Sequence, residues 1–166
     1  MQIDETPVPT GSLIAPFAQM AGHYTDCFCT ENPGAAGLSD LILAFYTQPL
    51  FQAERVVLRV LARAPSTDAQ AAELAAGTRG SFAVWTVQGR RDSEVLLADA
   101  SGRTMSWLQA DAEALRFGSV VVPVAGRRGK PTLGPVFHSL EGAHKVYARA
   151  LLSGAARRLA RRRARA

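Results

Sequence analysis

Three residues with metal-binding or acid–base side chains recur at a fixed interval near the C-terminus. His138, Glu141 and His144 are spaced i, i+3 and i+6 in a segment with helical periodicity. On a helix they would span about 120° of the surface, so two imidazoles and a carboxylate could face one iron or zinc ion. A di-metal site needs a second Glu-x-x-His motif, and the sequence contains none. We therefore expect no metal site, with His138 and Glu141 solvated and His144 at the edge of the core.

Two cysteines could also supply chemistry. Cys27 and Cys29 lie two residues apart in a strand-like segment that follows His23. The spacing is shorter than the Cys-x2–4-Cys of structural zinc sites. It would also place the Cα atoms about 6.6 Å apart, at the edge of disulfide range. We interpret both residues as reduced, buried side chains in a reducing compartment and expect no catalytic cysteine. The sequence contains neither a phosphate loop nor a dinucleotide-binding fingerprint, so we expect no cofactor.

The strongest charge feature is a cluster of arginines at the C-terminus. Six of the 19 basic residues lie there, and the rest of the chain has almost balanced charge. The cluster has no aromatic residues between its cations, so we expect no specific nucleic-acid recognition. Weak contact with an anionic lipid or nucleic-acid surface is one alternative function. The residues are Arg157, Arg158, Arg161, Arg162, Arg163 and Arg165.

The length and composition predict one globular domain. The chain has 166 residues, of which 48% are hydrophobic and 20% are charged, values typical of a folded domain with a real core. The N-terminal segment lacks the basic region and the apolar region that a signal peptide has. No apolar run reaches the roughly 18 residues that a membrane span needs. We therefore expect a cytoplasmic protein.

The periodicity changes along the chain from helix to strand and back to helix. We expect an irregular N-terminal arm over 1–22, a domain over 23–154 and an arginine-rich tail over 155–166. Thr67 and Gln70 have the spacing of a capping box, and Gly77 stands where a helix should end. The last helix begins near Gly134 and either ends at Ser153-Gly154 or continues into the arginines. The remaining expected elements are a strand at 24–30, helices at 38–46 and 50–62, a short helix after Pro65, and strands at 82–88, 94–98, 103–109 and 115–124.

This order predicts an α+β fold. Four closely spaced strands favour an antiparallel meander, and one long amphipathic C-terminal helix can cover a face of the curved sheet. Two or three short helices would be inserted after the first strand. Such an arrangement leaves room between sheet and helix, where ligand pockets often form.

Three short motifs stand out in the sequence: Tyr24-Thr25-Asp26-Cys27-Phe28, Glu94-Val95-Leu96-Leu97, and Leu133-Gly134 followed by a helix containing His144. They resemble those of a bacterial family of uncharacterised proteins within the helix-grip superfamily, also called START/Bet v 1-like or SRPBCC. The family's His-Leu-Asp is replaced here by Arg103-Thr104-Met105-Ser106-Trp107. The resemblance covers 24–152 and implies a curved antiparallel sheet around a long C-terminal helix. Its superfamily includes lipid and hormone carriers, aromatic cyclases and ring hydroxylases, so it implies no single activity.

The candidate ligand-binding residues are aromatic or lie on the C-terminal helix. Trp85 and Trp107, on alternating strands, would line an apolar cavity, and His144 or Tyr147 would supply a polar contact. Our leading expectation is a non-enzymatic binder of a small apolar or amphipathic molecule. The alternative is a cyclase- or hydrolase-like enzyme in the same cavity, with His144 as the best general base and Glu141 next. Arg103 and Arg116 would bind an anionic head group if they faced inward.

Overall fold

A seven-stranded antiparallel sheet forms the centre of the molecule. The computed structural model describes residues 1–61, 63–125, 131–133 and 135–164. The sheet has the order β1-β2-β7-β6-β5-β4-β3, and a separate two-stranded sheet pairs β8 with β9. The strands are β1 (Asp4–Glu5), β2 (Tyr24–Glu31), β3 (Ser81–Phe82), β4 (Trp85–Arg90), β5 (Glu94–Asp99), β6 (Thr104–Ala110), β7 (Ala114–Val121), β8 (Val124–Ala125) and β9 (Pro131–Thr132).

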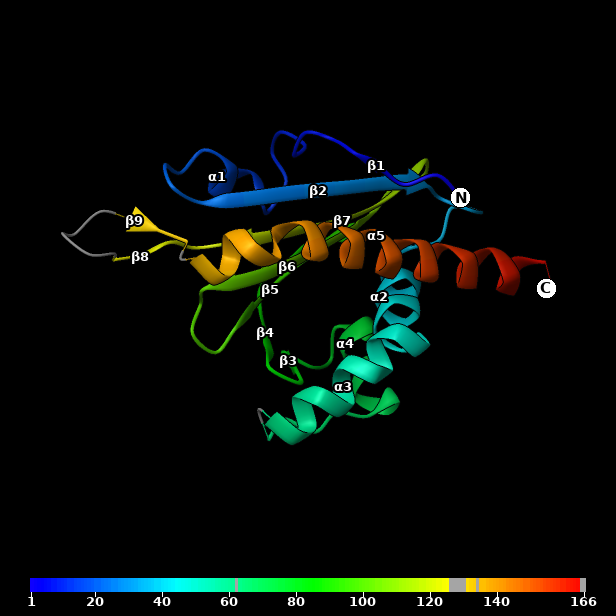
Figure 1. The fold of residues 1–166 in the computed structure, drawn as a ribbon. Helices are drawn as coiled ribbons and strands as arrows, with labels where there is room; N and C mark the ends of the chain where they lie inside the picture. The colour runs from blue at the N-terminus through cyan, green and yellow to red at the C-terminus, as the bar shows by residue number, and fades with distance from the viewer. Residues whose placement is uncertain (62, 126–130, 134, 165–166) are drawn as a thin grey trace.

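The four long helices gather on one side of this sheet. Helix α5 runs alongside β2 and β7, and α2 packs against α4, α5 and β6 (Figure 1). Helix α3 follows α2 and contacts both α2 and α5. None of the helices in the described ranges is long and apolar enough to cross a membrane. The helices are α1 (Ala15–Ala18), α2 (Leu38–Tyr46), α3 (Pro49–Leu61), α4 (Asp68–Ala76) and α5 (Pro135–Arg163).

Side chains alternate along each strand, so the sheet separates two hydrophobic clusters. On the helix face, Phe28, Leu108 and Phe117 join the main core with α2, α4 and α5. On the opposite face, which we call the arm face, Cys27 and Trp107 pack in a smaller cluster. The N-terminal arm, residues 1–22, covers this second face and contributes to its cluster.

The α+β architecture and several helix ends agree with the sequence analysis. Helix α2 has the expected bounds, and Thr67 and Gln70 form the predicted capping box of α4. Gly77 ends α4 in the left-handed conformation, as expected. The expected strand 82–88 is instead two strands, because Ala83 adopts a φ of 51° and turns the chain between β3 and β4.

The N-terminal arm is more regular than its prolines and glycines predict. Strand β1 extends the sheet by pairing Asp4 with Cys29 and Glu5 with Phe28. Further along, the Leu13 amide donates to Glu94 Oε2 at 2.8 Å. The arm is therefore fastened at one edge of the sheet and again over β5.

Helix α5 follows the second alternative and continues into the arginines. Ala155, Ala156 and Leu159 are buried in the main core, and Arg158 donates to the backbone oxygen of Thr47 at 2.9 Å. The expected division at residue 154 therefore falls inside a packed helix. The described part of the arginine segment belongs to the domain.

Gly118 lets the arm-face cluster approach β7. A Cβ atom there would lie 2.8 Å from the Asp26 backbone oxygen, 3.0 Å from Ile14 Cδ1 and 3.1 Å from Trp107 Cε3. We expect Gly118→Ala to lower the free energy of unfolding by about 1–3 kcal/mol, because the strand and the ring must both shift. Chemical denaturation measures this loss.

The matched control is Gly142→Ala in α5, where an added Cβ meets no atom within 4 Å. Because alanine is the better helix former, this variant should gain up to about 1 kcal/mol. Equal stability of the two variants would contradict the packing described for Gly118.

Candidate functional site

A cavity of about 510 Å³ lies between the helix face of the sheet and helix α5. Helices α2 and α3 close another side, and the cavity is partly open to solvent. Its volume is within the range of small-molecule sites, and its walls are mainly apolar and aromatic, as such sites usually are. The lining residues are Phe45, Tyr46, Phe51, Glu54, Trp85, Thr104, Met105, Ser106, Phe117, Ser119, Val120, Val121, Glu141, Ala143, His144, Tyr147 and Leu151.

Packed aromatic rings form one wall. The centroid of Phe45 lies 4.9 Å from that of Phe117 and 5.3 Å from that of Tyr46. Tyr46 in turn lies 4.8 Å from Phe51 at the start of α3. Such edge-on and tilted contacts stabilise ring pairs beyond simple burial. The wall therefore has a fixed shape even though its residues come from two helices and a strand.

A hydrogen-bond donor on the cavity wall is left without a partner among the described residues. Trp85 Nε1 is buried and makes no hydrogen bond there. The Tyr46 hydroxyl is also buried, but it lies beside the Ser106 side chain. Burial raises the pKa of Tyr46, and the contact with Ser106 opposes this rise only in part. Because buried polar groups are nearly always paired, Trp85 Nε1 suits an acceptor atom on a bound molecule.

Asp26 places a charged group behind His144. Its side chain is only 1% exposed, and Oδ1 accepts the Ser119 amide at 2.8 Å. Oδ2 lies 3.0 Å from both the Tyr24 hydroxyl and His144 Nε2. A carboxylate only accepts, so the imidazole proton shared with it is on Nε2. Burial and the Asp26 charge raise the pKa of Tyr24, which stays a donor.

The free ring nitrogen of His144 is available to the cavity. Among the described residues Nδ1 has no hydrogen-bond partner, and the residue both lines the cavity and keeps 32% of its side chain exposed. In a neutral imidazole that donates its Nε2 proton to Asp26, Nδ1 is the acceptor. The site thus combines the unpartnered Trp85 Nε1 donor with this acceptor.

The charged residues on the cavity wall are acidic. The Tyr147 hydroxyl donates to Glu54 Oε2, and burial raises the pKa of Glu54, opposed by this hydrogen bond. Glu54 forms no ion pair with the described residues. Glu141 lies 4.0 Å from Lys145, whose ammonium also bonds Glu5. No lysine or arginine is found among the described residues that line the cavity.

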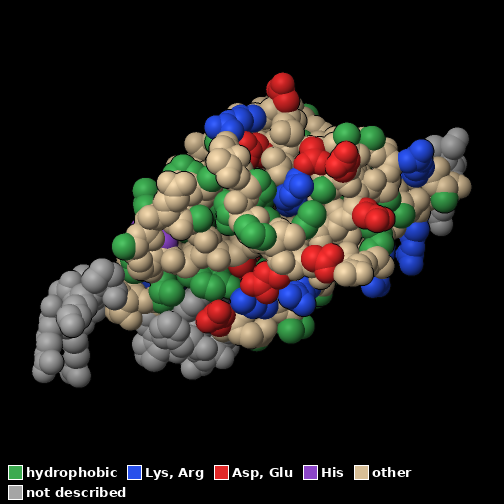
Figure 2. All heavy atoms as spheres, turned by 90° about the horizontal axis from the view of Figure 1, so that it is seen from above, with side chains coloured by type: hydrophobic (Ala, Val, Ile, Leu, Met, Phe, Trp, Pro, Cys, Tyr) green, Lys and Arg blue, Asp and Glu red, His purple; other side chains and the backbone are tan. Residues whose placement is uncertain are grey.

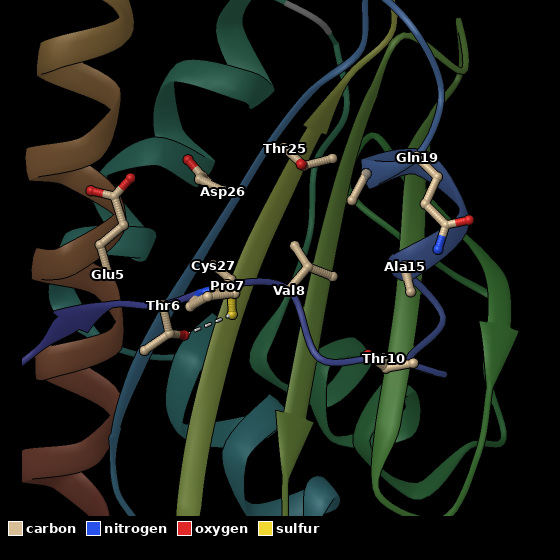
Figure 3. A pocket seen from close by; sticks show the side chains of 11 residues that line it. Glu5, Thr6, Pro7, Val8, Thr10, Ala15, Gln19, Thr25, Asp26 and Cys27 are labelled. Carbon is tan, nitrogen blue, oxygen red and sulfur yellow. Dashed lines mark hydrogen bonds between the residues drawn. The ribbon is translucent and has the colours of Figure 1, made fainter.

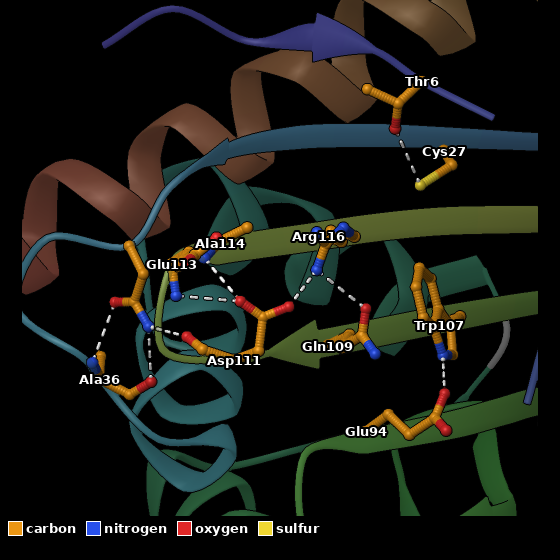
Figure 4. A network of polar contacts seen from close by, with 11 residues as sticks. Thr6, Cys27, Ala36, Glu94, Trp107, Gln109, Asp111, Glu113, Ala114 and Arg116 are labelled. Carbon is orange, nitrogen blue, oxygen red and sulfur yellow. Dashed lines mark hydrogen bonds and ion pairs between the residues drawn. The ribbon is translucent and has the colours of Figure 1, made fainter. Parts of the chain in front are cut away.

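Three of the four candidate binding residues meet at this cavity. Trp85, His144 and Tyr147 all line it. Trp107 does not, because strand alternation places its ring on the arm face, where it is completely buried. There its Nε1 donates to Glu94 Oε2 at 2.7 Å (Figure 4). Trp107 is therefore part of the second hydrophobic cluster and does not line the cavity.

The two arginines considered for an anionic head group also lie elsewhere. Arg116 pairs with Cys29 across the sheet and is bonded to Asp111 and Gln109 (Figure 4). Arg103 is exposed and does not line the cavity. The expected anion contact in the cavity therefore has no arginine to make it.

A second hollow lies between the N-terminal arm and β2 (Figure 3). Its volume is about 350 Å³, and Cys27 is on its wall. Both cysteines are free thiols. Burial raises the pKa of Cys27, opposed by the 3.5 Å hydrogen bond from Thr6, so the nucleophilic thiolate is disfavoured. Glu5 and Asp26 also line this hollow, and in Figure 3 their side chains lie on the side of α5.

The arginines of the C-terminal segment gather at the far end of α5. Lys and Arg side chains surround this end of the molecule in Figure 2. Arg157, Arg161, Arg162 and Arg163 are exposed, whereas Arg158 is held by Thr47. Arg165 and the basic loop at 126–130 lie outside the described residues, as does the side chain of His138.

Sequence reasoning gave no role to Asp26, Tyr46 or Glu54. An acidic residue between aromatic and cysteine positions of a strand was the available signal for Asp26, because a buried carboxylate requires partners. Tyr46 and Glu54 reach the cavity only through the packing of α2 and α3 against α5. No local pattern specifies that contact.

Comparisons with protein-family models, with curated proteins and with solved structures found no match for this chain.

Asp26 should contribute strongly to stability. Asp26→Ala leaves the Ser119 amide and the Tyr24 hydroxyl without their acceptor, so we expect a loss of about 3 kcal/mol in unfolding free energy. Asp26→Asn keeps one carbonyl acceptor and should lose roughly half as much. Urea denaturation of both variants measures the difference. Equal losses would mean that volume, and not hydrogen bonding, explains the effect.

Glu54 should make stability pH-dependent. Its pKa is raised above the ordinary value of 4.5, so the folded state holds the proton more tightly than the unfolded state. Protonated Glu54 therefore contributes to the free energy of unfolding at pH values below its pKa in the unfolded chain. This contribution is lost as the pH rises through its pKa in the folded protein. Glu54→Gln should therefore raise Tm more at about pH 8 than at about pH 4.

Differential scanning calorimetry provides the measurement, and Glu73→Gln on the exposed side of α4 is the control. Glu73 is half exposed and paired with Arg79, so its substitution should show little such dependence. A Glu54→Gln effect that is the same at both pH values would contradict the burial of this carboxylate.

Proposed function

We propose that this protein binds a small apolar or amphipathic molecule in the cavity between its sheet and helix α5. The observation that carries the proposal is the buried Trp85 Nε1, a donor without a hydrogen-bond partner among the described residues, on the wall of a cavity of about 510 Å³. An unpaired buried donor costs about 1–3 kcal/mol. A ligand acceptor would recover that free energy, and the aromatic wall would bury the ligand's apolar body.

We further propose that the arrangement is of the helix-grip type. Three features support this assignment: the first long strand pairs with the last strand of the meander, the sheet is wholly antiparallel, and a long C-terminal helix lies across it. The superfamily named from the sequence motifs would then supply a common reason for a cavity at this place. Binding without catalysis remains the leading proposal within it.

One observation favours the enzymatic alternative. His144 lines the cavity while Asp26 holds its Nε2, so that in the neutral imidazole Nδ1 carries no proton. This is the arrangement of a general base whose tautomer is fixed by a carboxylate. A cyclase- or hydrolase-like activity would use this nitrogen, and its substrate would occupy the volume assigned here to the ligand.

The two tryptophans allow a direct test of the cavity. They are the only two in the chain, and they lie on opposite faces of the sheet. In Trp107→Phe, bromocyclohexane should quench the remaining Trp85 in a saturable manner, because the bromine contacts a ring on the cavity wall. In Trp85→Phe, the remaining Trp107 should be unaffected at the same concentrations.

Ser106→Leu tests the same point in a chain with both tryptophans. Ser106 lines the cavity from β6, so leucine would occupy ligand volume and should abolish saturable quenching. Circular dichroism confirms that each variant is folded. Linear quenching of equal slope for Trp85 and Trp107 would show collision with the surface and would overturn the proposal.

A further inference from the structure

We infer that the ligand of this cavity carries a protonated amine on an apolar, ring-containing body. This inference rests on the proposed function and specifies its ligand class.

Glu54 is a carboxylate without a cation. It projects from α3 into the cavity wall, and its hydrogen bond comes from the neutral hydroxyl of Tyr147. No arginine, lysine or histidine in the described ranges forms an ion pair with it, although eight such pairs occur elsewhere. Removing a carboxylate from water is unfavourable unless a positive charge compensates. A ligand ammonium in the cavity would supply that charge.

The rings near Glu54 suit the same ligand. Phe51 precedes it by three residues and therefore lies on the same side of α3, and Tyr147 is bonded to it directly. Trp85, Phe45 and Phe117 complete the apolar lining. Aromatic faces attract cations, most strongly where water is displaced. An amine can thus sit against Glu54 while its body packs on the rings.

A ligand with a carboxylate group would meet negative charges in this cavity and no lysine or arginine among the described lining residues. Glu141 adds a second carboxylate to the lining, and Lys145 already bonds Glu5 at 2.8 Å. Within the described lining there is no lysine or arginine to neutralise an acid. The cavity therefore discriminates against fatty acids and other anionic amphiphiles by like-charge repulsion. The unpaired Trp85 Nε1 adds a place for a carbonyl or ether oxygen.

Three probes that share a naphthyl ring system but differ in charge distinguish the effect of charge from that of filling the cavity. They are 1-naphthylmethylamine, 1-naphthylmethanol and 1-naphthoate, titrated by calorimetry into the full-length protein near neutral pH. We expect the amine to bind about tenfold more tightly than the alcohol, and the acid to bind least. Glu54→Gln should lower affinity for the amine about tenfold and leave affinity for the alcohol unchanged.

The control variant is Glu73→Gln, which removes a negative charge on α4 outside the cavity lining. It should change none of the three affinities. If the alcohol or the acid binds as tightly as the amine, or if Glu54→Gln leaves the amine unaffected, the inference on charge is wrong while the cavity remains a binding site. If none of the probes binds, the proposed function itself fails.

Discussion

A carboxylate with 1% exposure must be hydrogen-bonded on every side, and Asp26 meets this requirement with partners from three elements. Its own strand contributes the Tyr24 hydroxyl, β7 contributes the Ser119 amide, and α5 contributes His144. The carboxylate therefore fixes where the long helix lies over the sheet. Because the cavity is the space left between that helix and the strands, its width depends on this one buried charge.

The other side of the cavity depends on how α2 meets α5. Gln48, just after α2, is buried and donates to the backbone oxygens of Phe45 and Leu151. Gly154 permits this approach, because a Cβ there would lie 2.0 Å from the Gln48 amide oxygen. The contact holds Tyr46 and Phe51 in the wall. Two polar anchors, one on each side, thus maintain an apolar space that side chains would otherwise close.

The sequence predicted local structure far better than it predicted the site. Periodicity and caps gave α2 and α4 nearly to the residue, because these features depend on neighbours in the chain. The sequence could not show on which face of the sheet Trp107 lies. Both alternating sets of side chains in its strand include aromatic or aliphatic residues, so either set could face the core. The sequence also gave no role to Glu54 or Tyr46. Their place in the wall results from contacts of α2 and α3 with α5, which lies about 90 residues further along the chain. Such contacts leave no local signature in the sequence.

The pairing of β2 with β7 has a consequence for how the chain folds. Strands β3 to β7 join neighbours through short connections, whereas Phe28 finds its partner Phe117 only about 90 residues later. Closing such a loop is entropically costly and slows folding. During synthesis, the aromatic and cysteine side chains of β2 must wait while most of the domain emerges from the ribosome. This first strand is therefore the segment most exposed to misassociation before the fold is complete.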